Sequence, residues 1–176
     1  MKRPIVTYGI IAGLIVSVMM AGSLSMKDKA DYDTGMVIGF TSMILAFSLI
    51  FFAIQSYKKL KGEVSFKQSL LIGLGITAIA STFYVITWLI VYYNFMPDFM
   101  EDYSAHYIEK MKHSGKSEAA IQAAIAEMEH SKELYKNPLY VVLFTFIEIV
   151  PVGLIVTFIA ALVEKIRTKP NVPKTV

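Results

Sequence analysis

Glu148 is the one charged residue in an otherwise uncharged apolar run that extends from 138 to 163. An ionised carboxylate inside a bilayer costs on the order of 3 kcal/mol on insertion scales, so such a residue is a candidate functional group. Pro151 follows three positions later and lacks the N–H that would bond the carbonyl of Ile147. A carboxyl beside an opened backbone resembles the proton or cation relays of transporters. The alternative is structural: Glu148 fixes helix register and Pro151 bends its helix.

No apolar run contains a Lys or Arg that could pair with Glu148 inside the membrane. Hydroxyl groups are the remaining hydrogen-bond donors that we weigh. Counting depth along the neighbouring runs, we expect the partners of Glu148 to come from Ser42, Ser48, Ser81 and Thr82.

Other catalytic or metal-binding patterns are weak. The three histidines lie with several carboxylates in the polar stretch 94–137, at positions 106, 113 and 130. Such groups can hold a divalent metal, but the spacing of a zinc site is absent, so we expect a solvated helix face and no metal. The chain has no cysteine, and it shows no P-loop, GxSxG, HExxH or GxGxxG motif. We expect no catalytic residues, no cofactor and no enzymatic activity.

The elements that must position Glu148 are four apolar runs, at about 4–25, 35–57, 69–93 and 138–163. Each is long enough to cross a bilayer, for which roughly 20 helical residues suffice. The composition agrees, because 55% of residues are hydrophobic and only 18% are charged, against about 25% charged in soluble domains. These numbers argue against a soluble enzyme, a disordered chain or a nucleic-acid binder. We predict an all-α integral membrane protein, with residues 1–176 forming a single membrane domain.

The first run is longer than a typical signal-peptide core, so we expect it to be retained.

Charge distribution predicts the orientation of these spans. The N-terminus, the 58–68 loop and the tail 164–176 carry ten Lys and Arg against two acidic residues. The 26–34 loop and the stretch 94–137 carry seven Lys against eleven acidic residues. By the positive-inside rule both termini are expected in the cytoplasm. The stretch 94–137 then lies outside, where two helical patterns separated by Gly115 predict a helical hairpin between the third and fourth spans.

Small residues recur every three to four positions along three of the runs. Such spacing allows helices to approach closely in a membrane. We therefore expect helix packing at Gly9, Gly13 and Ser17 in the first run, Gly35 and Gly39 in the second, and Gly153 in the fourth. Packing within the chain and packing in a homo-oligomer both fit this pattern.

Several motifs resemble a known family. They are the lead-in Val64-Ser65-Phe66-Lys67-Gln68 with Gly73 and Gly75, the stretch Ser114-Gly115-Lys116-Ser117-Glu118, and Tyr135-Lys136-Asn137-Pro138 followed by Glu148 and Pro151-Val152-Gly153-Leu154. With the four-span layout, they resemble the bacterial membrane family catalogued as domain of unknown function 4199. The resemblance extends to about Lys169. It implies a location in the bacterial cytoplasmic membrane, and it implies no activity.

Two functions remain open on these observations. The first is a non-enzymatic scaffold or accessory subunit, whose partners are the lipid bilayer and either a second copy or another membrane protein, and not nucleic acid. The second is a small oligomeric transporter of protons or cations that uses Glu148, because four spans are few to enclose a path alone.

Overall fold

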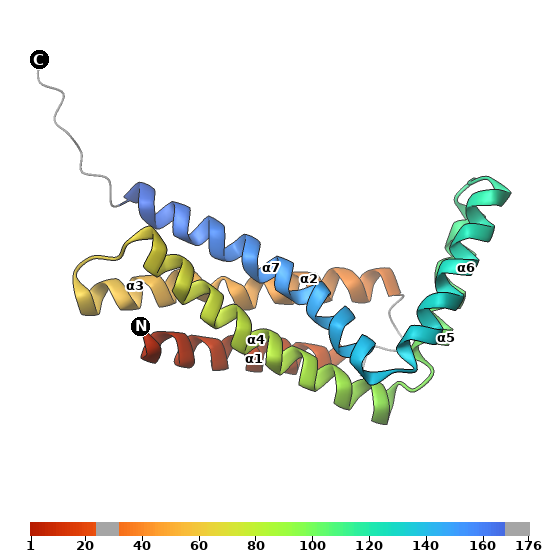
Figure 1. Ribbon diagram of the computed structural model, residues 1–176, viewed down its shortest axis with the longest axis horizontal. Coiled ribbons are helices and arrows are strands. Elements are labelled where there is room, and N and C mark those ends of the chain that lie inside the picture. Colours follow the sequence, from red (N-terminus) through yellow and green to blue (C-terminus); the bar gives the residue numbers. More distant parts are fainter. Residues whose placement is uncertain (24–31, 168–176) are drawn as a thin grey trace, which may run out of the picture.

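The computed structural model describes residues 1–23 and 32–167, which form helices and no strands (Figure 1). Four apolar helical stretches in this part of the chain are long enough to cross a membrane. They coincide with the four predicted runs, so the protein is an all-α, multi-pass membrane protein. The helices are α1 (Lys2–Ser23), α2 (Tyr32–Phe47), α3 (Leu49–Lys61), α4 (Phe66–Phe95), α5 (Phe99–His113), α6 (Glu118–Tyr135) and α7 (Pro138–Arg167).

Local sequence signals set several helix ends. Ser65 and Gln68 form a reciprocal capping box at the start of α4, and the Ser117 hydroxyl accepts the Ala120 N–H at the start of α6. Pro138 is the first residue of α7, where its missing N–H costs nothing. Gly115 follows α5 and has a φ of +69°, a backbone conformation that residues other than glycine rarely adopt.

Two boundaries differ from the sequence expectation. The second span is divided at Ser48 into α2 and α3, although the backbone N–H of Ser48 still bonds the carbonyl of Ile44. The fourth span does not end at Val163, because α7 continues to Arg167 and includes Glu164. The remaining residues of the predicted tail, 168–176, lie outside the described part, as do residues 24–25 of the first run and most of the 26–34 loop.

The bundle is organised around α4, which packs against α1 on one side and α7 on the other. The second span closes the bundle, with α2 against α1 and α7 and α3 against α1, α4 and α7. Their shared core contains fully buried apolar side chains from all five of these helices, among them Phe47, Ile50, Ile72, Ile76 and Ile149. Figure 1 shows that the start of α1, the α3–α4 connection and the end of α7 gather at one end of the bundle, here called the basic end.

Helices α5 and α6 form the predicted hairpin, which projects from the opposite end of the bundle, here called the hairpin end (Figure 1). The two helices pack against each other, and Ile121 and Ala124 of α6 are buried. Met100 of α5 is buried in a different cluster, with Tyr92 of α4 and Val141 of α7. The aromatic side chains of α5 do not all face α6. Phe99 packs against Trp88 of α4 with ring centres 4.9 Å apart, and Tyr103 packs against Tyr32 of α2 at 5.8 Å.

An ion pair also joins the hairpin to the second span. Lys110 Nζ of α5 lies 2.7 Å from each carboxylate oxygen of Asp33 at the start of α2. Both side chains are about half exposed to solvent. Aromatic packing and this ion pair together attach the hairpin to α2 and α4.

Candidate intramembrane carboxyl site

Glu148 is hydrogen-bonded to a tyrosine rather than to a serine or threonine. The Tyr84 hydroxyl of α4 donates a hydrogen bond to Glu148 Oε1 over 3.3 Å. Tyr84 is almost fully buried, whereas Glu148 is exposed on the outer surface of α7. Glu148 is the eleventh residue of α7, which places it roughly 15 Å along the helix from the hairpin end. The carboxyl therefore lies within the span, and only one side of it rests on the bundle.

None of the four predicted hydroxyl partners contacts Glu148. Three of them donate to carbonyls of their own helices: Ser42 to Gly39 at 2.7 Å, Ser48 to Leu45 at 2.6 Å, and Thr82 to Ala78 at 2.9 Å. Ser81 Oγ is buried and has no hydrogen-bond partner among the described residues. For Ser42, Ser48 and Thr82 the expectation failed because a short hydroxyl side chain bonds a nearby carbonyl of its own span more readily than it reaches across to another helix.

Tyr84 was identifiable in principle from the sequence. A tyrosine in the middle of an apolar span needs a partner for its hydroxyl, and a carboxylate on a neighbouring span is an acceptor of suitable reach. We considered only serine and threonine hydroxyls as donors to Glu148.

Pro151 lies within α7 and does not end it. The carbonyl of Ile147 thus faces a position without an N–H donor. Ile147 and Pro151 are both exposed on the surface of α7, beside Glu148. The exposed surface of α7 at this level presents a carboxyl and an opened backbone carbonyl, as the sequence spacing predicted.

The charge of Glu148 acts on tyrosines of the hairpin. Burial, together with the nearby Glu148 carboxylate, raises the pKa of Tyr135 to about 12. The pKa of Tyr103 is also raised, mainly by burial, and Tyr107, Asp33 and Glu148 contribute. Tyr84 therefore bonds the carboxyl directly, whereas Tyr103 and Tyr135 of the hairpin are influenced by its charge.

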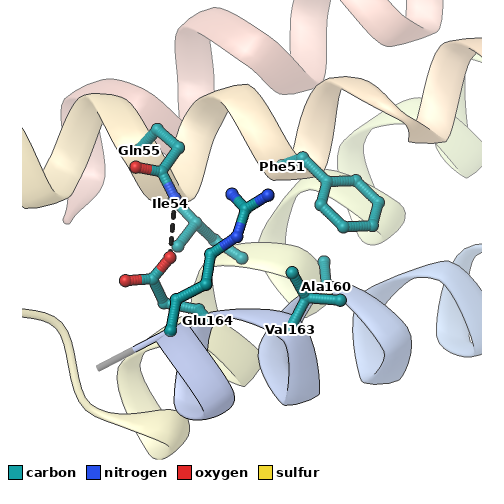
Figure 2. A pocket seen from close by; sticks show the side chains of 7 residues that line it. Phe51, Ile54, Gln55, Ala160, Val163 and Glu164 are labelled. Atoms are coloured by element: carbon teal, nitrogen blue, oxygen red, sulfur yellow. Dashed lines mark hydrogen bonds between the residues drawn. The ribbon is translucent and has the colours of Figure 1, made fainter. Parts of the chain in front are cut away.

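A second carboxyl site lies at the basic end and was missed by the sequence reasoning. Glu164 is only 2% exposed. Its Oε1 accepts from Lys58 Nζ and its Oε2 from Gln55 Nε2, each at 2.6 Å, as Figure 2 shows for Gln55. A cavity of about 20 Å³ beside it, lined by Phe51 and Arg167 among others, has room for about one water molecule. The apolar run ends at Val163, so Glu164 was assigned to the tail.

The small residues contribute unequally to helix packing. Gly9 and Gly13 of α1 face Ile79 and Phe83 of α4, so closely that an added Cβ would lie within 3 Å of those side chains. Ser17 accepts a hydrogen bond of 2.8 Å from the Thr87 hydroxyl.

On the fourth span, Gly153 packs against Thr77 of α4, while Gly73 of α4 packs against Thr157 of α7. Gly35 and Gly39 differ, because no described atom lies within 4 Å of an added Cβ. The close packing predicted for these two glycines is therefore not seen in the described part of the chain.

A groove of about 440 Å³ lies on the surface between α4 and α7. One wall carries hydroxyl groups of α4, and the other carries apolar side chains of α7. The wall residues include Thr77, Ser81 and Thr82, beside the apolar Leu74 and Ala78, on α4, and Phe146, Val150 and Leu154 on α7. Glu148 does not line this groove.

No cluster of three or more His, Cys, Asp or Glu side chains suited to a metal occurs among the residues that the structure describes. The His106 ring packs at a tilt against the Tyr32 ring, with ring centres 5.2 Å apart. Within the described ranges 1–23 and 32–167, the intramembrane carboxyl and the buried ion pair are thus the two polar arrangements that stand out.

Comparison with family models identifies a family for this chain. A family described as protein of unknown function (DUF4199) matches residues 7–165, which cover most of the first and fourth spans and all of the second and third. The chain belongs to this family. Comparisons with curated proteins and with solved structures gave no significant match. The family description names no activity.

Proposed function

We propose that the protein is a non-enzymatic membrane scaffold or accessory subunit that binds another membrane component through the surface around Glu148. The observation that supports this is the position of the carboxyl: it is exposed on the outer surface of a span and receives one hydrogen bond, from Tyr84. A carboxylate left against hydrocarbon is costly, and intramembrane acids almost always face protein or water. A partner helix over this surface supplies the missing environment.

The packing of the bundle favours assembly over an internal path. The centre of the α4–α7 contact is filled by Thr77 and Thr157, whose side chains meet Gly153 and Gly73. Apolar residues such as Phe47 and Ile149 are fully buried beside them. Functional polarity is on the outer surface of α7 rather than in the core. A role in binding therefore fits this arrangement better than a role in catalysis.

We further propose that the protein resides in the bacterial inner membrane with both termini in the cytoplasm. The fold supports the grouping of charges on which this rests. Basic residues from the start of α1, the end of α3 and the end of α7 belong to the same end of the bundle. The hairpin, with its excess of acidic residues, lies at the other end.

Photocrosslinking in intact membranes tests the scaffold role. A photoreactive amino acid replaces Ile147, which is 66% exposed and adjacent to Glu148. The matched control replaces Ile86, which is 53% exposed on α4 and lies two residues from Tyr84, on a different face of the helix. At position 147 we expect a discrete protein adduct whose yield falls when Glu148→Gln is introduced. At position 86 we expect no adduct whose yield depends on Glu148→Gln. A folded protein that gives only lipid adducts at 147 contradicts the proposal.

One observation favours the transporter as a second candidate. The charge of Glu148 helps to raise the pKa of Tyr103 and Tyr135, so the carboxyl is electrostatically coupled to ionisable groups of the hairpin. The test is proton or cation flux into vesicles containing the purified chain. If Glu148→Gln abolishes the flux while the variant stays folded, the result supports transport. If a folded oligomer of the unaltered protein shows no flux, the transporter candidate is refuted.

A further inference from the structure

We infer that the component bound at the Glu148 surface is a transmembrane helix carrying a Lys or Arg side chain at the depth of Glu148. This inference rests on the proposed scaffold function and adds the chemistry of the partner. It follows from which hydrogen-bonding groups the surface offers and which it lacks.

The surface offers acceptors. An ionised carboxylate has about four lone-pair sites, and the structure shows one donor to Glu148, the Tyr84 hydroxyl. The Ile147 carbonyl adds a second acceptor, because Pro151 has no N–H to give it. The neighbouring exposed side chains on this side of α7 are apolar, including Ile147 and Ile155. A partner that satisfies this surface brings donors, and an ammonium or guanidinium group brings several together with the complementary charge.

The chain itself does not supply this cation. Lys and Arg are absent from the apolar cores of all four spans. Lysines at both ends of the spans are already paired: Lys58 with Glu164 at the basic end, and Lys110 with Asp33 and Lys136 with Glu133 at the hairpin end. A second copy joined through the same surface would bring a second Glu148, and two carboxylates at one site oppose each other's ionisation. Charge complementarity therefore favours a different membrane protein.

A free metal cation fits the surface less well. Calcium is held by six to eight oxygen ligands and magnesium by six. Glu148 is a single carboxylate, and the described residues contain no cluster of three acidic or metal-binding side chains. A side-chain cation anchored in its own helix needs only the acceptors present here.

Binding of model helices to the purified full-length protein in liposomes tests the inference. The probes are synthetic leucine-rich transmembrane helices, one with a single lysine at the depth of Glu148 and one with leucine there. A third probe carries its lysine two helical turns away. Association is measured by energy transfer between labelled peptide and protein. We expect the lysine helix to bind about tenfold more tightly than the leucine helix, and the displaced lysine to lose most of this gain.

Two variants assign the preference to the carboxyl. Glu148→Gln should remove the preference for lysine, while Glu148→Asp, which keeps the charge, should retain most of it. Helix content and elution volume of each variant confirm that it is folded. Equal binding of the lysine and leucine helices to the unaltered protein overturns the inference, as does a lysine preference that survives Glu148→Gln.

The result separates this inference from the scaffold function itself. A crosslinked partner at position 147, without any lysine preference in liposomes, leaves the scaffold and refutes the cationic partner. Crosslinking of the chain to a second copy at position 147 also refutes it, because that outcome identifies the occupant as a homo-oligomer.

Discussion

Thr77 and Thr157 bring their hydroxyl oxygens within 3.4 Å of each other at the contact between α4 and α7. Each threonine also packs on a glycine of the opposite helix: Thr157 on Gly73 and Thr77 on Gly153. In both helices the glycine precedes the threonine by four residues, and the helices run in opposite directions. The contact is thus a reciprocal pair of glycine–threonine fits, and it sets the distance between the two helices.

Substitution of either glycine should separate these helices. A Cβ at Gly73 would lie 2.6 Å from Thr157 Oγ1, and one at Gly153 would lie 2.7 Å from Thr77 Oγ1. We expect Gly73→Ala and Gly153→Ala each to lower the free energy of unfolding by about 1–3 kcal/mol, the usual cost of overpacking. Thermal unfolding in detergent, followed by circular dichroism, measures the change.

Gly39→Ala is the matched control for this prediction, because no described atom lies within 4 Å of an added Cβ there. Its stability should be unchanged or slightly raised, since alanine favours helix over glycine. Equal losses at Gly39 and Gly73 would show that glycine matters for reasons other than the α4–α7 contact.

Removal of the Glu164 carboxylate should destabilise the basic end. Glu164→Ala leaves Lys58 and Gln55 without their shared acceptor. Breaking a buried ion pair costs about 3–5 kcal/mol, but Lys58 is 30% exposed and can turn toward water, so we expect about 1–3 kcal/mol. Chemical denaturation in mixed micelles measures this loss.

The double variant Lys58→Ala/Glu164→Ala isolates the pair, and its loss should be smaller than the sum of the single losses. Glu63 is an exposed acidic residue at the same end, so Glu63→Ala should leave the free energy of unfolding nearly unchanged. Strict additivity of the two single losses argues that the contact contributes little to folding.

The spans themselves were predictable because length and hydropathy are sufficient to recognise a membrane helix. The capping residues Ser65 and Ser117 were likewise readable, since their signals are local. Glu164 was not, because a charge at the end of an apolar run is taken as the boundary of the span, although the helix continues and buries it. Gly35 and Gly39 show a related difficulty: regular spacing of small residues gives the face of a helix but not whether another helix occupies it.

Alkaline pH should loosen the hairpin through Tyr135. The pKa of Tyr135 is raised from 10 to about 12, chiefly by burial, so the folded state keeps its proton where the unfolded state loses it. Its contribution to stability is therefore complete below pH 10 and declines as the pH rises toward 12. Tyr135→Phe should make the unfolding temperature fall less steeply over this range. Tyr140→Phe, at an exposed tyrosine, should keep the steeper fall; identical profiles for all three proteins would contradict the prediction.

Membrane orientation can be read with single cysteines, because the chain has none of its own. Ser114→Cys lies in the exposed turn of the hairpin and Glu63→Cys in the exposed α3–α4 connection. In the proposed orientation, a membrane-impermeant maleimide labels position 114 in intact bacterial cells and position 63 only after permeabilisation. The reverse pattern would invert the proposed topology.

The two ion pairs of the second span differ in their exposure to solvent, and this difference makes the protein's response to salt one-sided. The Asp33–Lys110 pair is about half exposed, whereas Glu164 in the Lys58–Glu164 pair is almost fully enclosed. Dissolved ions screen exposed charges and have little access to enclosed ones. Rising ionic strength therefore weakens the attachment of the hairpin to α2 and leaves the closure of α3 on α7 intact. The same increase in salt concentration therefore loosens the hairpin end of the protein and leaves the basic end unchanged.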